Sequence, residues 1–200
     1  VKMILMLIVV ESVKEGAFSL DQKVHISRAA SRIGGSQVYL KEGEVFTLGE
    51  LLKAVVIASA NDAAYAVAEH VAGDAEIFVE MMKDRARELG MTDTHYVNVH
   101  GLPPNRGSLP NLMSSRDVGI LAQELLKFPI ITQWGRTKRA TFRGGKFILT
   151  NTNRLIGRFR GIDGLKTGFY RKAGFSIAST AKQGDLRLIA ITLGSSHSRR

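Results

Sequence analysis

The feature that most constrains this chain is its opening run, in which Lys2 is followed by eight apolar residues, Met3 to Val10. Such a run must be buried, yet it is too short to span a bilayer, which takes about 20 residues. It also lacks the small residues of a signal-peptide cleavage site before Glu11. We therefore expect a buried helix from the start of the chain to about Glu15, stopped by Gly16. Burying the charge of Lys2 at the start of this helix is costly, which suggests that Lys2 has a functional role.

The overall composition is that of a globular domain. Apolar residues make up 44% of the 200 residues and charged residues 23%, which is ordinary for folded proteins. A chain of this length can bury a hydrophobic core large enough to fold without disulfides or metal ions. It contains no cysteine, which excludes disulfides and thiolate metal sites but does not fix the compartment.

Helical signals fill the first two thirds of the sequence. Thr47 and Glu50 have the spacing of a capping box, in which each side chain satisfies the other residue's backbone N–H. Ser114 or Ser115 is expected to cap the last of the long helices, and Pro129 to end it. The predicted helices cover residues 1–15, 47–59, 60–73, 74–90 and 116–128.

Strand signals gather at the end of the chain. Residues 164–169 (GLKTGF) predict a strand, and residues 173–195 predict a hairpin that turns at 183–185. Helices followed by strands are typical of an α+β fold rather than of alternating βαβ units. We expect one domain over residues 1–200, with a mainly helical part over about 1–135 and a sheet part over about 161–200.

The net charge of +10 is concentrated between Trp134 and Lys172, where only Asp163 opposes the basic residues. Such a stretch indicates either an anionic partner or a solvated basic face, and the sequence leaves both open. It contains no recognisable nucleic-acid-binding motif, so we expect no nucleic-acid partner. The histidines show no metal-ligand spacing, and we expect neither a metal site nor another cofactor.

Three short segments point to chemistry only when they are taken together. Alone, Ser59–Asp62 is typical of a capped junction between helices, and Lys166–Gly168 is typical of a strand after a turn. Penicillin-binding proteins and serine β-lactamases use S-x-x-K at the head of a buried helix, S-x-N at a helix junction and K-T-G on a strand. Lys2, Ser59–Asn61 and Lys166–Gly168 resemble these elements in order, element type and spacing.

The wider sequence resembles the serine D-alanyl-D-alanine carboxypeptidases, the low-molecular-mass penicillin-binding proteins of peptidase family S11, over almost its whole length. The most specific pieces are IASANDAA, HGLP, SSRDVG and DGLKTG. The resemblance implies a β-lactamase/transpeptidase-like fold, in which a helical region packs on an antiparallel sheet. This family has further segments before its catalytic serine and after its last strand. We therefore expect this chain to be an internal portion of a longer protein, with an incomplete sheet.

The resemblance implies four catalytic residues, Lys2, Ser59, Asn61 and Lys166. The nucleophilic serine is expected two residues before Val1, and Lys2 would take its proton. A lysine is charged at neutral pH unless burial or a nearby positive charge lowers its pKa, and Lys166 is a candidate for that charge. Ser59 would relay a proton to the leaving amine, and Asn61 would orient Lys2 and bind the substrate's amide.

Three residues after Lys166 are implied in substrate binding. Thr167, together with Lys166, would hold the free carboxylate of the substrate. Gly168 would let the strand backbone approach the substrate closely, and the N–H of Phe169 would contribute to an oxyanion hole. His100 is interpreted as a loop-packing residue rather than a catalyst.

The implied reaction removes the terminal D-alanine from peptidoglycan stem peptides through an acyl-enzyme, with β-lactam antibiotics as covalent inhibitors. The implied location is the bacterial cell envelope, in the periplasm or on the outer face of the cytoplasmic membrane. Peripheral membrane association through a C-terminal segment outside this chain stays open. The alternatives are a D,D-endopeptidase, a β-lactamase of the same fold, and a non-catalytic homologue that binds stem peptides or penicillin.

Overall fold

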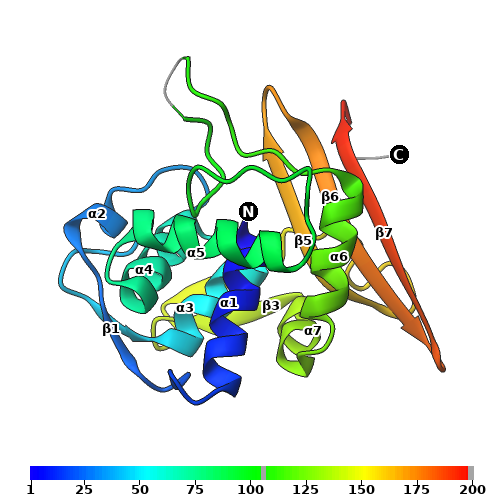
Figure 1. The fold of residues 1–200 in the computed structure, drawn as a ribbon. Coiled ribbons are helices and arrows are strands. Elements are labelled where there is room, and N and C mark those ends of the chain that lie inside the picture. The colour runs from blue at the N-terminus through cyan, green and yellow to red at the C-terminus, as the bar shows by residue number, and fades with distance from the viewer. Residues whose placement is uncertain (105–106, 198–200) are drawn as a thin grey trace.

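The computed structural model describes residues 1–104 and 107–197, and Figure 1 shows its helices gathered on one side of a three-stranded antiparallel sheet. The first helix, α1 (Lys2–Lys14), buries every residue from Lys2 to Val10. A helix that is apolar on all sides belongs in a core, and the predicted buried helix is confirmed. Gly16 follows it with φ +79°, a left-handed conformation that glycine adopts without strain.

The other long helices pack around α1. They begin where the sequence signals place them, with Thr47, Asp74 and Ser114 each accepting a backbone N–H as an N-cap. Thr47 and Glu50 form the predicted capping box. These helices are α3 (Leu48–Ala58), α4 (Asn61–Ala72), α5 (Ala75–Glu88) and α6 (Ser115–Leu125).

The prediction for Pro129 is corrected by the structure. Helix α6 ends at Leu125, and Pro129 instead begins α7 (Pro129–Gly135) at its first position. Proline has no N–H to contribute to a helix, but the first turn of a helix needs none, so its fixed φ favours this place. Helix α7 approaches the sheet closely, because a Cβ on Gly135 would lie 2.6 Å from the carbonyl oxygen of Asp163.

The main sheet has the order β5–β6–β7 and is antiparallel throughout. Its strands are β5 (Ile162–Tyr170), β6 (Gly174–Gln183) and β7 (Leu186–Ser195). The predicted strand at 164–169 and the predicted hairpin with its turn at 183–185 are therefore confirmed. In the register, Lys166 of β5 lies opposite Ala178 of β6, which in turn lies opposite Ile191 of β7. Ile191 reaches towards Gly119 of α6, so the helices cover this face of the sheet.

Several small elements connect these layers. Sequence reasoning placed no element between the last predicted helix and the first predicted strand, yet β3 and β4 form a hairpin there. Each of these strands has only four residues, so the alternation of apolar and polar residues is too short to predict a strand. Within the described residues, no helix is both long and apolar enough to cross a membrane. The small elements are β1 (Lys23–His25), α2 (Arg28–Ser31), β2 (Val45–Thr47), β3 (Arg139–Phe142) and β4 (Phe147–Thr150).

The capping box at the start of α3 provides a test of this description. We expect Thr47→Ala to lower the free energy of unfolding by about 1 kcal/mol, because the N–H of Glu50 loses its side-chain acceptor. Thr47→Ser keeps the hydroxyl and is the matched control. Urea denaturation measures both variants, and equal stability of the two would contradict the assigned cap.

Candidate active site

Lys2 is the centre of the candidate site. It lies at the first position of α1 and its side chain is buried, with 8% of its surface exposed. Its Nζ donates to Asn61 Oδ1 at 2.5 Å and to the carbonyl oxygen of His100 at 2.6 Å. These hydrogen bonds join the start of α1, the start of α4 and the loop after residue 97.

Asn61 is held so that its carbonyl oxygen faces Lys2. Its backbone N–H donates to Ser36 O at 2.7 Å, and its Nδ2 donates to Gly34 O at 2.8 Å. Gly35 has φ +80°, and a Cβ there would lie 2.6 Å from Asn61 Nδ2. Sequence reasoning assigned no role to this pair of glycines, although adjacent glycines are a signal of close backbone approach.

Ser59 lies at the junction between α3 and α4, as predicted. It is the C-cap of α3 and is half-buried, with φ 59° and ψ 29°. A left-handed conformation costs a residue other than glycine about 1–2 kcal/mol, and such strain gathers at functional sites. The junction is tied to the sheet side of the molecule, because Thr152 N donates to Ile57 O at 3.1 Å.

Lys166 is the second buried lysine of the site, on β5, with 8% of its surface exposed. Its Nζ donates to the carbonyl oxygen of Thr167 at 2.9 Å. Burial, and then the positive charge of Lys2, hold the pKa of Lys166 well below its usual value. The two lysines are therefore close enough for their charges to interact.

Burial lowers the pKa of Lys2 to about 8, while the negative charge of Asp62 opposes part of that change. Sequence reasoning expected both burial and the charge of Lys166 to lower this pKa. Burial is the main cause, but Lys166 does not contribute, because burial disfavours the charged form of Lys166 itself. Asp62 is itself fully buried and accepts hydrogen bonds from the backbone N–H groups of Val38, Leu40 and Ala63. With a pKa near 8, about a tenth of the Lys2 side chains are neutral at pH 7.

The residues after Lys166 lie at the more exposed end of β5. Thr167 Oγ1 donates to Thr152 Oγ1 at 2.7 Å, and Gly168 is exposed. Phe169 has 60% of its surface exposed, and its ring stacks on that of Phe175 at a centroid distance of 4.2 Å. The three candidate substrate-binding residues are thus accessible, and their role stays a prediction.

The loop 151–153 supports this strand, and sequence reasoning assigned it no role. Asn153 Nδ2 donates to Gly164 O at 3.0 Å, and Asn151 Nδ2 donates to Gly135 O at 2.8 Å. Together with the hydrogen bonds of Thr152, the loop connects the end of α3 to β5. Two asparagines that flank a threonine indicate a turn, but this pattern does not predict which backbone groups the asparagines bind.

Positive charge dominates the site. In residues 1–104 and 107–197, neither Lys2 nor Lys166 has a carboxylate oxygen within 4.0 Å, and the same residues hold no group of three or more side chains suited to a metal ion. An anionic group would stabilise the charged forms of these two buried lysines, so the site favours the binding of such a group.

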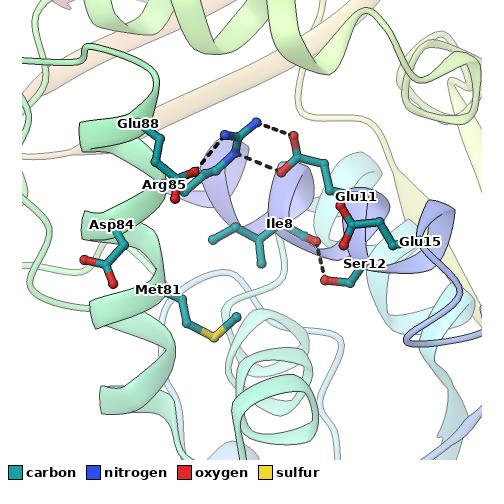
Figure 2. Close-up of a pocket in the computed structure, with 8 residues that line it drawn as sticks. All are labelled: Ile8, Glu11, Ser12, Glu15, Met81, Asp84, Arg85 and Glu88. Atoms are coloured by element: carbon teal, nitrogen blue, oxygen red, sulfur yellow. Dashed lines mark hydrogen bonds and ion pairs between the residues drawn. The ribbon is translucent and has the colours of Figure 1, made fainter.

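A different pocket, of about 360 Å³, lies between α1 and α5 (Figure 2). Arg85 of α5 donates to Glu11 of α1 at 2.6 Å and to Glu88 at 2.9 Å. Four of the five charged residues in its walls are acidic, which suits an anionic ligand poorly, and none of the predicted site residues lies there. The pocket is lined by Ile8, Glu11, Ser12, Glu15, Met81, Asp84, Arg85 and Glu88.

Residues 1–197 match the family model described as D-alanyl-D-alanine carboxypeptidase, peptidase S11. The chain belongs to this family. It is 39% identical over 198 residues to the D-alanyl-D-alanine carboxypeptidase DacF of Bacillus subtilis, covering 98% of this chain and 50% of DacF. The chain thus spans about half the length of the curated relatives that it matches.

Solved structures of D-alanyl-D-alanine carboxypeptidases and penicillin-binding proteins share the fold. Penicillin-binding protein 6B of Escherichia coli superposes with a TM-score of 0.90 at 30% identity, covering 99% of this chain and 63% of that one. Penicillin-binding protein D2 of Listeria monocytogenes, in its ampicillin-bound form, has a TM-score of 0.87 at 28% identity, covering 98% and 78%. The predicted α+β fold of the β-lactamase/transpeptidase type is confirmed.

The contact between Gly35 and Asn61 can be tested with a matched pair of substitutions. We expect Gly35→Ala to lower the free energy of unfolding by at least about 1–2 kcal/mol, because alanine is strained at positive φ and its Cβ displaces the Asn61 amide. Gly34→Ala is the control, since a Cβ there meets nothing within 4 Å. Denaturant unfolding measures both, and an equal loss in the two variants would contradict the close approach.

Proposed function

We propose that the complete protein is a serine D,D-carboxypeptidase that removes the terminal D-alanine from peptidoglycan stem peptides through an acyl-enzyme. The observation that carries the proposal is Lys2, a buried lysine with a lowered pKa that is held by Asn61 and His100 at the head of α1. An amine of this kind can act as a general base near neutral pH.

In the first step, a serine two residues before Val1 gives its hydroxyl proton to the neutral amine of Lys2. Positions i and i+3 of a helix share one face, which suits the transfer. The serine oxygen then attacks the carbonyl carbon of the penultimate D-alanine. The carbon–nitrogen bond breaks, and the proton passes from Lys2 through the Ser59 hydroxyl to the leaving amine. Water then hydrolyses the serine ester by the reverse proton path.

The substrate's free carboxylate is the group that Lys166 and Thr167 would bind. The absence of an ion-pair partner for Lys166 among the described residues supports this role. The backbone N–H groups of Phe169 and of the nucleophilic serine would stabilise the oxyanion of the tetrahedral intermediate. Asn61 would bind the substrate's amide while it orients Lys2.

Residues 1–200 would form part of one penicillin-binding domain. Its substrate lies outside the cytoplasmic membrane, so the proposal implies an exported protein of the bacterial cell envelope. Membrane association through a segment after this chain remains a separate hypothesis. The alternatives are a D,D-endopeptidase, a β-lactamase of this fold and a non-catalytic binding homologue.

The first test is the intact mass of the complete protein after exposure to benzylpenicillin. We expect one stable adduct, mapped to the serine two residues before Val1, and no adduct when that serine is replaced by alanine. A folded protein that forms no adduct would overturn the proposal in favour of a binding homologue. Rapid loss of the adduct would favour a β-lactamase, and release of D-alanine from uncrosslinked rather than crosslinked muropeptides separates a carboxypeptidase from an endopeptidase.

The pKa of Lys2 predicts how acylation depends on pH. Acylation requires the neutral amine, so its rate is expected to rise with a midpoint near pH 8. Asp62→Asn removes the charge that raises the pKa of Lys2, and the midpoint should move to lower pH. Asp117→Asn is the control, because Asp117 is also fully buried but does not act on Lys2. Penicillin acylation rates measure both, and an unmoved or higher midpoint in Asp62→Asn would contradict the assignment.

A further inference from the structure

We propose that His100 is a positioning residue whose backbone carbonyl, fixed by its own imidazole, aims the lone pair of Lys2 at the nucleophile. This inference rests on the proposed function and extends it to a residue outside the three motifs. It also replaces the interpretation of His100 as a residue that only packs the loop.

The Lys2 amine can donate only a fixed number of hydrogen bonds. A charged lysine has three N–H donors, so the neutral amine that acts as a base keeps two N–H groups and one lone pair. Two acceptors already contact Nζ, Asn61 Oδ1 at 2.5 Å and His100 O at 2.6 Å. When both N–H groups are engaged, the lone pair has one remaining direction. With Asn61 alone, the amine could rotate about its terminal bond and the lone pair would have no fixed direction.

The His100 carbonyl is held in place by hydrogen bonds within its turn. The imidazole Nδ1 of His100 accepts the N–H of Leu102 at 3.1 Å. Asn98 closes the same turn from the other side, because its Oδ1 accepts the N–H of Gly101 at 2.7 Å and its Nδ2 donates to Leu102 O at 3.0 Å. Asn111 braces Asn98 with a further hydrogen bond of 3.2 Å. Side chains thus fix a turn that contains no helix or strand.

The environment of the His100 imidazole determines its protonation state. Burial, and then the positive charge of Lys2, lower the pKa of His100 to about 4. The ring is therefore neutral at working pH, and the hydrogen bond that Nδ1 accepts puts the proton on Nε2. The Nδ1 lone pair is occupied by Leu102 and does not compete with Lys2 as a base. A neutral ring beside Lys2 also adds no charge to the site, so its contribution is geometric.

Two substitutions separate this role from loop packing. Asparagine can present its Oδ1 near the position of the imidazole Nδ1, so His100→Asn keeps an acceptor for the N–H of Leu102. Glutamine matches the more distant Nε2 and does not supply that acceptor, so His100→Gln is the matched control of similar polarity. His100→Ala removes the ring altogether.

The experiment measures acylation of the complete protein by benzylpenicillin over a range of concentrations. We expect His100→Ala and His100→Gln to lower the maximal acylation rate constant about 10- to 100-fold, the loss that a misplaced reacting group causes. The penicillin concentration at half-maximal rate should stay unchanged, because the proposed role of His100 acts through Lys2 rather than through binding of the substrate. His100→Asn should restore most of the rate. Thermal unfolding of each variant confirms that it is folded, and the Asn and Gln variants carry the test if the Ala variant does not fold.

The outcomes separate this inference from the proposed function. An unreactive wild-type protein would overturn both. A reactive wild type whose Gln and Ala variants acylate at the wild-type rate would overturn the role of His100 alone. Equal losses in the Asn and Gln variants would likewise overturn it, because the Nδ1 acceptor would then not matter.

Discussion

The pair of hydrogen bonds from Lys2 to Asn61 and to the His100 carbonyl is the interaction on which the rest of the site depends. It places an amine inside the core, where the charged form is unfavourable. The fall of its pKa from 10.5 to about 8 corresponds to about 3 kcal/mol against the charged state. The apolar run of α1 offsets this cost, because the eight residues directly after Lys2 are buried. The stability of the apolar core thus keeps Lys2 buried, although burial of its charged form is unfavourable.

Each group around Lys2 is positioned by contacts from a neighbouring loop, some of them distant in the chain and some local. Gly34 and Gly35 orient the amide of Asn61, and Asn98 closes the turn that carries His100. The loop 151–153 joins the end of α3 to β5, which carries Lys166. These supports are loops that hydrogen bonds and close contacts hold in place without a ligand, so the site is organised before any substrate arrives. The left-handed Ser59 is the one position among the proposed catalytic residues where the backbone itself is strained.

The positive net charge of the molecule does not form one continuous basic surface. Lys166 belongs to the buried site, and Arg143 pairs with Glu44 while its guanidinium lies over the rings of Phe46 and Phe142. Part of the basic stretch therefore has structural or site roles rather than forming one docking face. Acidic residues, by contrast, line the pocket between α1 and α5, where Arg85 pairs with Glu11 and Glu88. Binding of an anionic partner by the remaining basic residues stays a hypothesis.

The amino-acid sequence by itself predicted most of the local elements and named the candidate site residues. The apolar run after Lys2 predicted a buried helix, Thr47 and Glu50 predicted a cap, and the spacing of three motifs predicted which residues belong together. These signals depend on neighbours in the chain, so they can be read without a fold. Only the tertiary structure decided that the His100 carbonyl lies against Lys2, 98 residues away, and that Gly35 must lack a side chain beside Asn61. Such contacts arise when separate elements pack, and no local pattern records which backbone carbonyl will face a buried amine.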